Sequence, residues 1–148
     1  MLVDVEQNTG FLIHTNGTYV SFPVATGQRK TVRYIGRTYF AATPLRSWTI
    51  TGMDLKDDRN TFGTSGRFFR LNRNNERTPY GIHGHAASTV MLGSSSSNRY
   101  RSMGCVIVSE KVLDILGRTL QKNGSINVVT SGAVAQQVET AVKEFTGQ

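Results

Sequence analysis

The sequence predicts a mainly β fold with two helices, in the α+β class. Its first hundred residues contain short apolar or alternating segments separated by turn residues, without sustained helical periodicity. After Cys105, two segments with apolar residues at helical spacing follow. With 148 residues the chain can bury its own core without disulfides, so we expect one domain over residues 1–148.

Eight strands are predicted in the first part of the chain. They are Leu2–Val5, Gly10–Thr15, Thr18–Pro23, Lys30–Tyr34, Tyr39–Ala42, Ser47–Met53, Phe68–Leu71 and Gly81–His83. Asn16-Gly17 predicts a hairpin turn, because both residues tolerate positive φ. Ala25-Thr26-Gly27 predicts a further turn, and the polar stretches Leu55–Ser65 and Asn72–Pro79 predict surface loops.

The remaining elements lie in the last third of the chain. Four consecutive serines in Gly93–Asn98 favour a mobile loop. Ser109 is a suitable N-cap for a helix over Glu110–Lys122, which Asn123-Gly124 would end. A strand over Ser125–Thr130 and a C-terminal helix over about 132–146 follow. The apolar stripe of that second helix comprises Val134, Val138, Ala141, Val142 and Phe145.

Positive charge is in excess, with 17 Lys and Arg against 10 Asp and Glu and a net charge of +7. The surplus is concentrated in Arg67, Arg70, Arg73, Arg77, Arg99 and Arg101, opposed in that stretch by Glu76 alone. Such a surface favours nucleic acid, an acidic membrane or a carboxylate-rich polymer such as a cell wall, or is simply solvated. The sequence carries no RNA-recognition, zinc-finger or basic-helix motif, so we expect no nucleic-acid partner.

No apolar run approaches the roughly 18 residues that a membrane-spanning helix needs, and we expect no membrane span. The first residues include Asp4 and Glu6 where a secretory signal would be basic and then apolar. An extracellular substrate would therefore require a signal or anchor that is absent from this chain, or another route of export.

The clearest chemical feature is Cys105, the single cysteine, which follows Ser102, Met103 and Gly104 and lies downstream of His83. A thiol attacks as its thiolate, and a nearby imidazole is the common acceptor for its proton. Glycine before the cysteine allows close approach of the backbone, so the amides around it are candidates for an oxyanion hole.

Other interpretations of the same residues remain open. Cys105 could be a small buried apolar residue, and an isolated histidine is often structural. If residues 81 to 85 form a strand, His83 and His85 share one face, and with Cys105 they could bind zinc, completed by Glu76 or Glu110. A serine nucleophile at Ser102 lacks the elbow motif expected of such enzymes.

The motifs resemble those of the L,D-transpeptidase catalytic domain, the YkuD-like family. The resemblance rests on Ile82–Gly84, a spacer and Ser102–Val106. Two upstream segments are similar to family strands as well, namely Phe22–Gly27, which ends in Thr-Gly, and Ala42–Ile50, which begins with Ala-Thr-Pro. In total the resemblance covers about residues 1 to 130.

This resemblance implies a β-sandwich-like fold and a cysteine peptidyl transferase. Cys105 would attack the carbonyl after the meso-diaminopimelate of a peptidoglycan tetrapeptide stem, releasing D-alanine and forming a thioester. His83 would be the general base, oriented by the carbonyl of Gly84, while Ser102 and Gly104 frame the oxyanion hole. The alternatives are a carboxypeptidase or endopeptidase that hydrolyses the same stems, and a non-catalytic wall-binding module.

The chain departs from the family pattern at two positions beside the cysteine. Met103 replaces the usual histidine, and Ile107 replaces the usual arginine or asparagine. A substrate carboxylate would then have to be bound elsewhere, by Arg101, Arg99 or Arg77. The spacer between the histidine and cysteine motifs is also longer than is typical, chiefly through the serine run.

Tyr80, His85 and Arg101 complete the predicted site as substrate-binding residues. We expect neither a metal nor a cofactor, since a cysteine acyl-enzyme needs none. The expected partner is a peptidoglycan stem peptide, the expected oligomeric state is a monomer, and the expected location is the cell envelope or the extracellular space.

Overall fold

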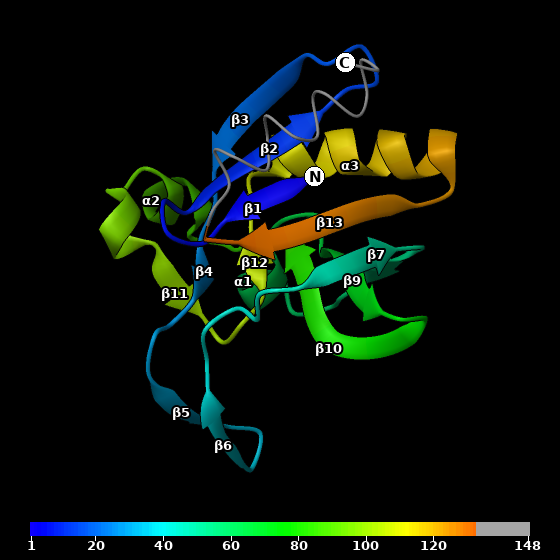
Figure 1. Cartoon of the computed structure of the whole chain (residues 1–148). Helices are drawn as coiled ribbons and strands as arrows, with labels where there is room; N and C mark the ends of the chain where they lie inside the picture. The colour runs from blue at the N-terminus through cyan, green and yellow to red at the C-terminus, as the bar shows by residue number, and fades with distance from the viewer. Residues whose placement is uncertain (133–148) are drawn as a thin grey trace.

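The mainly β class predicted from the sequence is confirmed by a computed structural model, which describes residues 1–132 (Figure 1). The predicted C-terminal helix falls, beyond Gly132, outside the described residues. Within the described part, no helix is both long and apolar enough to cross a membrane.

One large sheet organises the molecule. Within residues 1–132 it has nine strands, eight of them in the order β12-β10-β9-β7-β13-β1-β2-β3, with β8 paired to β9. The strands are β1 (Leu2–Asp4), β2 (Thr9–Ile13), β3 (Tyr19–Pro23), β7 (Ser47–Ile50), β8 (Met53–Leu55), β9 (Arg67–Arg73), β10 (Glu76–His83), β12 (Val106–Ile107) and β13 (Ile126–Ser131). Most pairs are antiparallel, but β1 with β13 and β10 with β12 are parallel.

Two short pairs lie beside this sheet. β5 (Thr31–Tyr34) and β6 (Arg37–Phe40) form a hairpin that projects from the body of the molecule (Figure 1). β4 (Thr26–Gly27) pairs in parallel with β11 (Tyr100–Ser102). The turn predicted at residues 25 to 27 is therefore wrong. Gly27 is needed there for close packing, since a Cβ on it would lie 1.9 Å from the Ala41 carbonyl oxygen.

The helix after the cysteine is confirmed as α3 (Glu110–Asn123). The Ser109 hydroxyl accepts a hydrogen bond from the Val112 N–H at the start, and Gly124 ends the helix with a left-handed φ of 79°. Val112, Leu113 and Leu116 form its buried face.

Three short helical turns were not predicted: α1 (Arg59–Phe62), α2 (Ser88–Leu92) and the 3₁₀ helix Ser96–Asn98. α1 lies inside a segment expected to be a loop. The Asp58 carboxylate starts it by accepting the N–H groups of Asn60 and Thr61.

The segment Asn72–Pro79 is not a loop but the turn end of the β9–β10 hairpin, with six of its eight residues in strands, so that prediction is wrong. Asn74 and Asn75 form its tight turn with φ of 49° and 65°, a conformation that asparagine tolerates. Pro79 lies where the pairing register shifts between Arg77 and Gly81. The irregularity accommodates a residue that has no N–H to donate.

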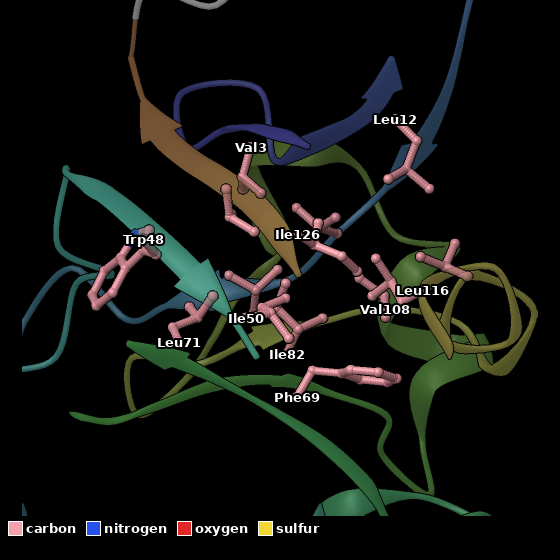
Figure 2. Packing of buried hydrophobic residues seen from close by; sticks show 14 of the residues in the cluster. Val3, Leu12, Trp48, Ile50, Phe69, Leu71, Ile82, Val108, Leu116 and Ile126 are labelled. Atoms are coloured by element: carbon pink, nitrogen blue, oxygen red, sulfur yellow. The ribbon is translucent and has the colours of Figure 1, made fainter. Parts of the chain in front are cut away.

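The core lies between the sheet and α3 (Figure 2). Leu116 and Leu113 from the helix pack against fully buried sheet residues such as Ile50, Phe69 and Ile82. This core fixes β10, and β10 in turn positions the candidate site at its end.

Candidate active site

Parallel pairing of β10 and β12 brings the predicted histidine and cysteine together. Ile82 pairs with Val106 and His83 with Ile107. Ile82 and Val106 belong to the core, so the residues on either side of them face the opposite side of the sheet. Cys105, which directly precedes β12, therefore shares with His83 the face away from the core.

The cysteine loop is held by the buried Ser102 side chain. Its hydroxyl donates to the Cys105 carbonyl at 2.5 Å and accepts the Gly104 N–H at 3.1 Å. Ser102 thus fixes the turn before the sulfur, and the Gly104 amide is already engaged within the loop.

Two upstream motifs contact the same loop. The Thr43 hydroxyl accepts the Gly27 N–H at 2.9 Å and donates to the Gly104 carbonyl at 2.8 Å. The Tyr39 hydroxyl donates to the Met103 carbonyl at 2.8 Å. Segments that are distant in sequence therefore hold the backbone from Met103 to Gly104 in one conformation.

Gly104 has a φ of +130°, and a Cβ at this position would lie 2.5 Å from the Tyr80 ring. Any other residue would meet both backbone strain and this ring. Tyr80 is itself fixed edge-on against Trp48, with ring centroids 5.7 Å apart. The glycine before the cysteine is thus required by the packing of the loop.

The His83 ring is oriented by the backbone. Its Nδ1 lies 2.5 Å from the carbonyl oxygen of Gly84. A carbonyl only accepts hydrogen bonds, so Nδ1 carries the proton and Nε2 is the nitrogen with a free lone pair. A side chain on Gly84 would lie 2.9 Å from the Glu110 Oε1 atom, so the packing around this carbonyl excludes a larger residue.

Aromatic rings enclose the imidazole. Phe68 stacks on His83 at 5.8 Å between centroids, and Phe62 meets it edge-on at 4.9 Å. The Phe68 ring also occupies the space above Gly81, where a Cβ would lie 2.3 Å from it. His83 is consequently only 4% exposed.

Burial keeps both the imidazole and the thiol neutral. It lowers the pKa of His83 from 6.5 to about 4, a shift that the Gly84 hydrogen bond opposes. It raises the pKa of Cys105 from 9.0 to about 11, although a Gly81 backbone hydrogen bond and the charges of Arg70 and Lys56 act in the opposite direction. Among the described residues, no hydrogen bond joins this thiol to His83.

Cys105 borders two cavities. The first, of about 390 Å³, is also lined by His83, His85 and Arg101. The second, of about 480 Å³, lies under the β5–β6 hairpin and is lined by Tyr39 and Tyr80, among others. Cys105 therefore lies where the two cavities meet, together with Tyr34, Ile35, Pro79 and Met103, which line both.

The fold and this arrangement were compared with known proteins. The L,D-transpeptidase catalytic domain family, YkuD, matches residues 1–134 of the chain. The chain belongs to this family. A search of curated proteins found no match.

Three solved structures share the fold of this L,D-transpeptidase domain. An L,D-transpeptidase from Xylanimonas cellulosilytica is 20% identical, with a TM-score of 0.59 over 88% of this chain and 58% of that one. Bd1075 of Bdellovibrio bacteriovorus is 16% identical, with a TM-score of 0.57 over 99% and 54%. A mutant Enterococcus faecium L,D-transpeptidase is 14% identical, with a TM-score of 0.57 over 88% and 48%. The chain thus spans about half the length of the structures it matches.

His85 and Arg101, which were also expected at the site of this L,D-transpeptidase domain, both line the first cavity. His85 lines the first cavity, but β10 ends at His83, so the two histidines do not alternate along one strand. The Nδ1 atom of His85 accepts the Ala87 N–H at 2.9 Å. Arg101 is exposed at the rim of the same cavity.

Arg99 is not a substrate-binding residue. It is 8% exposed, and its guanidinium donates to main-chain carbonyls of Gln7, Asn8, Val24 and Ser94. Its hydrogen bonds within residues 1–132 are to main-chain carbonyls that it holds in place, which corrects one of the arginines considered from the sequence.

The zinc interpretation also has no support in the geometry. Within residues 1–132, no three His, Cys, Asp or Glu side chains are grouped as metal ligands would be. Glu110, one of the acids considered, binds Arg67 at 3.1 Å and the Ser65 hydroxyl at 2.7 Å. These hydrogen bonds outweigh burial, which by itself would raise the Glu110 pKa, and the net effect is a lowered pKa.

The sequence reasoning missed four residues that line the first cavity: Lys56, Phe62, Phe68 and Arg70. Lys56 and Phe62 lie in a segment interpreted as a loop, Phe68 was assigned to a strand, and Arg70 was counted in the basic surplus without a role at the site. The signal that could have found them is the aromatic-basic cluster Arg67–Arg70, but its proximity to the cysteine depends on pairing between distant strands.

Proposed function

We propose that the chain is a cysteine acyltransferase that acts on peptidoglycan stem peptides, an L,D-transpeptidase. The observation that carries the proposal is the placement of Cys105 and of His83, with its Nδ1–H on the Gly84 carbonyl, on one cavity wall. Nucleophile, base and orienting acceptor are the three parts that such chemistry needs. Family membership supports peptidoglycan stems as the substrate class.

In the first step the thiol attacks the carbonyl carbon between diaminopimelate and D-alanine of a tetrapeptide stem. The proton on Sγ passes to Nε2 of His83, while the new S–C bond forms. Attack and proton transfer are coupled because neither the thiolate nor the imidazolium is stable alone in this buried site.

The carbonyl oxygen becomes an oxyanion in the tetrahedral intermediate. We assign its stabilisation to the main-chain N–H of Cys105, because the Gly104 N–H is engaged by Ser102. When the intermediate collapses, the C–N bond breaks and His83 returns its proton to the departing D-alanine amine. A thioester on Cys105 remains.

The second cavity supports transfer over hydrolysis. Cys105 lines this cavity as well, together with residues of the β5–β6 hairpin, and its volume of about 480 Å³ leaves room for the amine-bearing side chain of another stem. That amine would attack the thioester, give its proton to His83 and release the thiol. Water in place of the amine would make the protein a carboxypeptidase. Because peptidoglycan lies outside the cytoplasmic membrane, the proposed location is the cell envelope.

The test is turnover of disaccharide-tetrapeptide fragments, followed by mass spectrometry of the products. We expect release of D-alanine and formation of a cross-linked dimer by the wild type. Cys105→Ala and His83→Gln should each reduce release by at least about 10³-fold, since nucleophile and base act as one unit. His14→Gln is the matched control, because His14 is exposed and distant in sequence from the cavity residues.

Turnover that persists in Cys105→Ala would reject the mechanism, and D-alanine release without dimers would favour the hydrolase. A wall-binding module would instead bind purified sacculi without turnover. A β-lactam of the carbapenem type distinguishes this module from an enzyme. In intact-protein mass spectrometry, an active thiol gains the mass of the β-lactam, whereas an inert thiol does not.

A further inference from the structure

The side chain of Lys56 places its positively charged ammonium group beside the candidate site. It follows β8, which pairs with β9, and its main-chain N–H donates to the Gly66 carbonyl at 2.8 Å. Its ammonium nitrogen lies 4.9 Å from the centroid of the Phe68 ring and 5.8 Å from that of Phe62. The same two rings enclose His83.

The ammonium of Lys56 differs from the neighbouring cations in its partners. Arg67 pairs with Glu110 and Asp114, and Arg70 donates to Asp54 and to the Thr78 carbonyl. Within residues 1–132, no carboxylate lies within ion-pair distance of the Lys56 nitrogen. Among the described residues its charge is therefore unpaired and can interact with an anion in the cavity.

The surroundings increase the strength of such an interaction. Lys56 is half-buried and lines the 390 Å³ cavity with Cys105 and His83. Aromatic faces hold the ammonium and keep water from part of it, which strengthens its attraction for an anion in the cavity. The Lys56 charge also acts on the sulfur, since it lowers the pKa of Cys105.

We propose that Lys56 is a specificity-determining residue that binds a carboxylate of the stem peptide within the first cavity. The inference rests on the proposed function for the identity of the peptide. It assigns the carboxylate contact to a residue on the β8 side of the cavity, in addition to the exposed Arg101.

A tetrapeptide stem offers carboxylates on both sides of the bond to be cleaved. One is the terminal carboxylate of D-alanine, and the other is on the side chain of diaminopimelate. The chemistry at Lys56 is the same for both, so substrates that lack one or the other identify the source.

The experiment compares four synthetic tetrapeptides in which position three is diaminopimelate or lysine and the C-terminus is a free acid or an amide. Lysine removes the side-chain carboxylate, and the amide removes the terminal one. KM and kcat for release of the fourth residue are measured for wild type, Lys56→Met, Lys56→Arg and Lys56→Gln. Lys111→Met is the control, because Lys111 is exposed on α3 and outside the cavity.

We expect Lys56→Met to raise KM about 10- to 100-fold for peptides that carry the recognised carboxylate, and less than about twofold for peptides that lack it. Lys56→Arg should restore KM to within a few-fold, while Lys111→Met should behave as wild type. Equal losses on all four peptides, or no loss on any, would overturn the proposal.

A binding measurement separates this proposal from the proposed function. The Kd of all four peptides is determined by calorimetry with Cys105→Ala, with and without Lys56→Met. If the wild type shows no turnover but Lys56→Met weakens binding only of the peptides that carry one of the two carboxylates, the carboxylate site stands and the chemistry fails. Binding that is indifferent to Lys56 overturns the site itself.

Discussion

The chemistry of Cys105 and His83 depends on how each residue is desolvated. The same burial acts on an acid and on a base, so it raises one pKa to about 11 and lowers the other to about 4. At neutral pH the resting site therefore contains a thiol and a neutral imidazole. Reactivity should then require the substrate, and bulk alkylating reagents should react slowly with this cysteine.

The depressed His83 pKa predicts a pH-dependent stability. In the unfolded chain its pKa is near 6.5 and in the fold about 4, so the unfolded state binds more protons between these values. The free energy of unfolding should fall as pH decreases from about 6.5 to 4, by about 3 kcal/mol from this residue. Urea unfolding at several pH values measures it.

In His83→Gln this part of the pH dependence should disappear, while His14→Gln should retain it. If His83→Gln lost as much stability as the wild type between pH 7 and 4, the imidazole would not be the group responsible.

The site residues that could be identified from the sequence differ from those that could not in how they come to lie at the site. Cys105, His83 and Gly84 belong to short motifs that resemble those of a known family, so their proximity could be expected from that resemblance, although the pairing of β10 with β12 creates it. Lys56 and Phe68 reach the same cavity only through the pairing of β8, β9 and β10, which no local pattern encodes. Their contribution emerged from the strand order.

At the scale of elements, hydrogen bonds of the Thr130 side chain connect β13, in the centre of the sheet, to β7 and the segment before it. Its hydroxyl accepts the Trp48 Nε1–H at 3.1 Å and the Arg46 N–H at 3.0 Å, and donates to the Pro44 carbonyl at 2.6 Å. The side chain is 2% exposed, so water cannot replace these partners.

Thr130→Val should therefore destabilise the protein by about 1–3 kcal/mol, because it keeps the shape and leaves the indole N–H unpaired. Chemical denaturation measures the difference. Thr119→Val is the control, since among residues 1–132 the Thr119 hydroxyl bonds only to the Ile115 carbonyl within α3. Equal effects in the two variants would show that the β13 hydroxyl has no special role.

Elements could be predicted where one face is apolar and buried. Prediction failed where a strand carries mainly exposed polar residues and resembles a loop. α3 could be predicted because its cap, apolar stripe and terminating glycine agree. Asn72–Pro79 reads as a loop because Arg73, Glu76 and Arg77 are exposed on the hairpin. β4 and β12 have two residues each, too few for any periodicity to be visible.

At the scale of the whole molecule, Arg99 joins segments that are remote in sequence. Its four main-chain acceptors come from the turn after β1, the residue after β3 and the serine-rich segment. The Arg99 carbonyl also accepts the Thr26 N–H at 2.9 Å. The longer spacer between histidine and cysteine is thereby packed against the body of the protein.

Arg99→Met should lower the free energy of unfolding by at least about 3 kcal/mol, because it leaves several buried carbonyls without donors. Thermal and urea unfolding measure the loss. Arg101→Met, two residues away and exposed, should change stability by less than about 0.5 kcal/mol. A comparable loss in both variants would mean that the buried Arg99 guanidinium does not stabilise the contact between these segments.

The position of β1 in the sheet has a consequence for biosynthesis. Leu2 pairs with Val129, and β13 lies between β1 and β7. On the ribosome, the sheet centre cannot close until the chain has emerged as far as β13, and the nascent β1 and β7 edges stay unpaired meanwhile. We expect such a polypeptide to depend on holding chaperones during synthesis more than a protein whose neighbouring strands are consecutive.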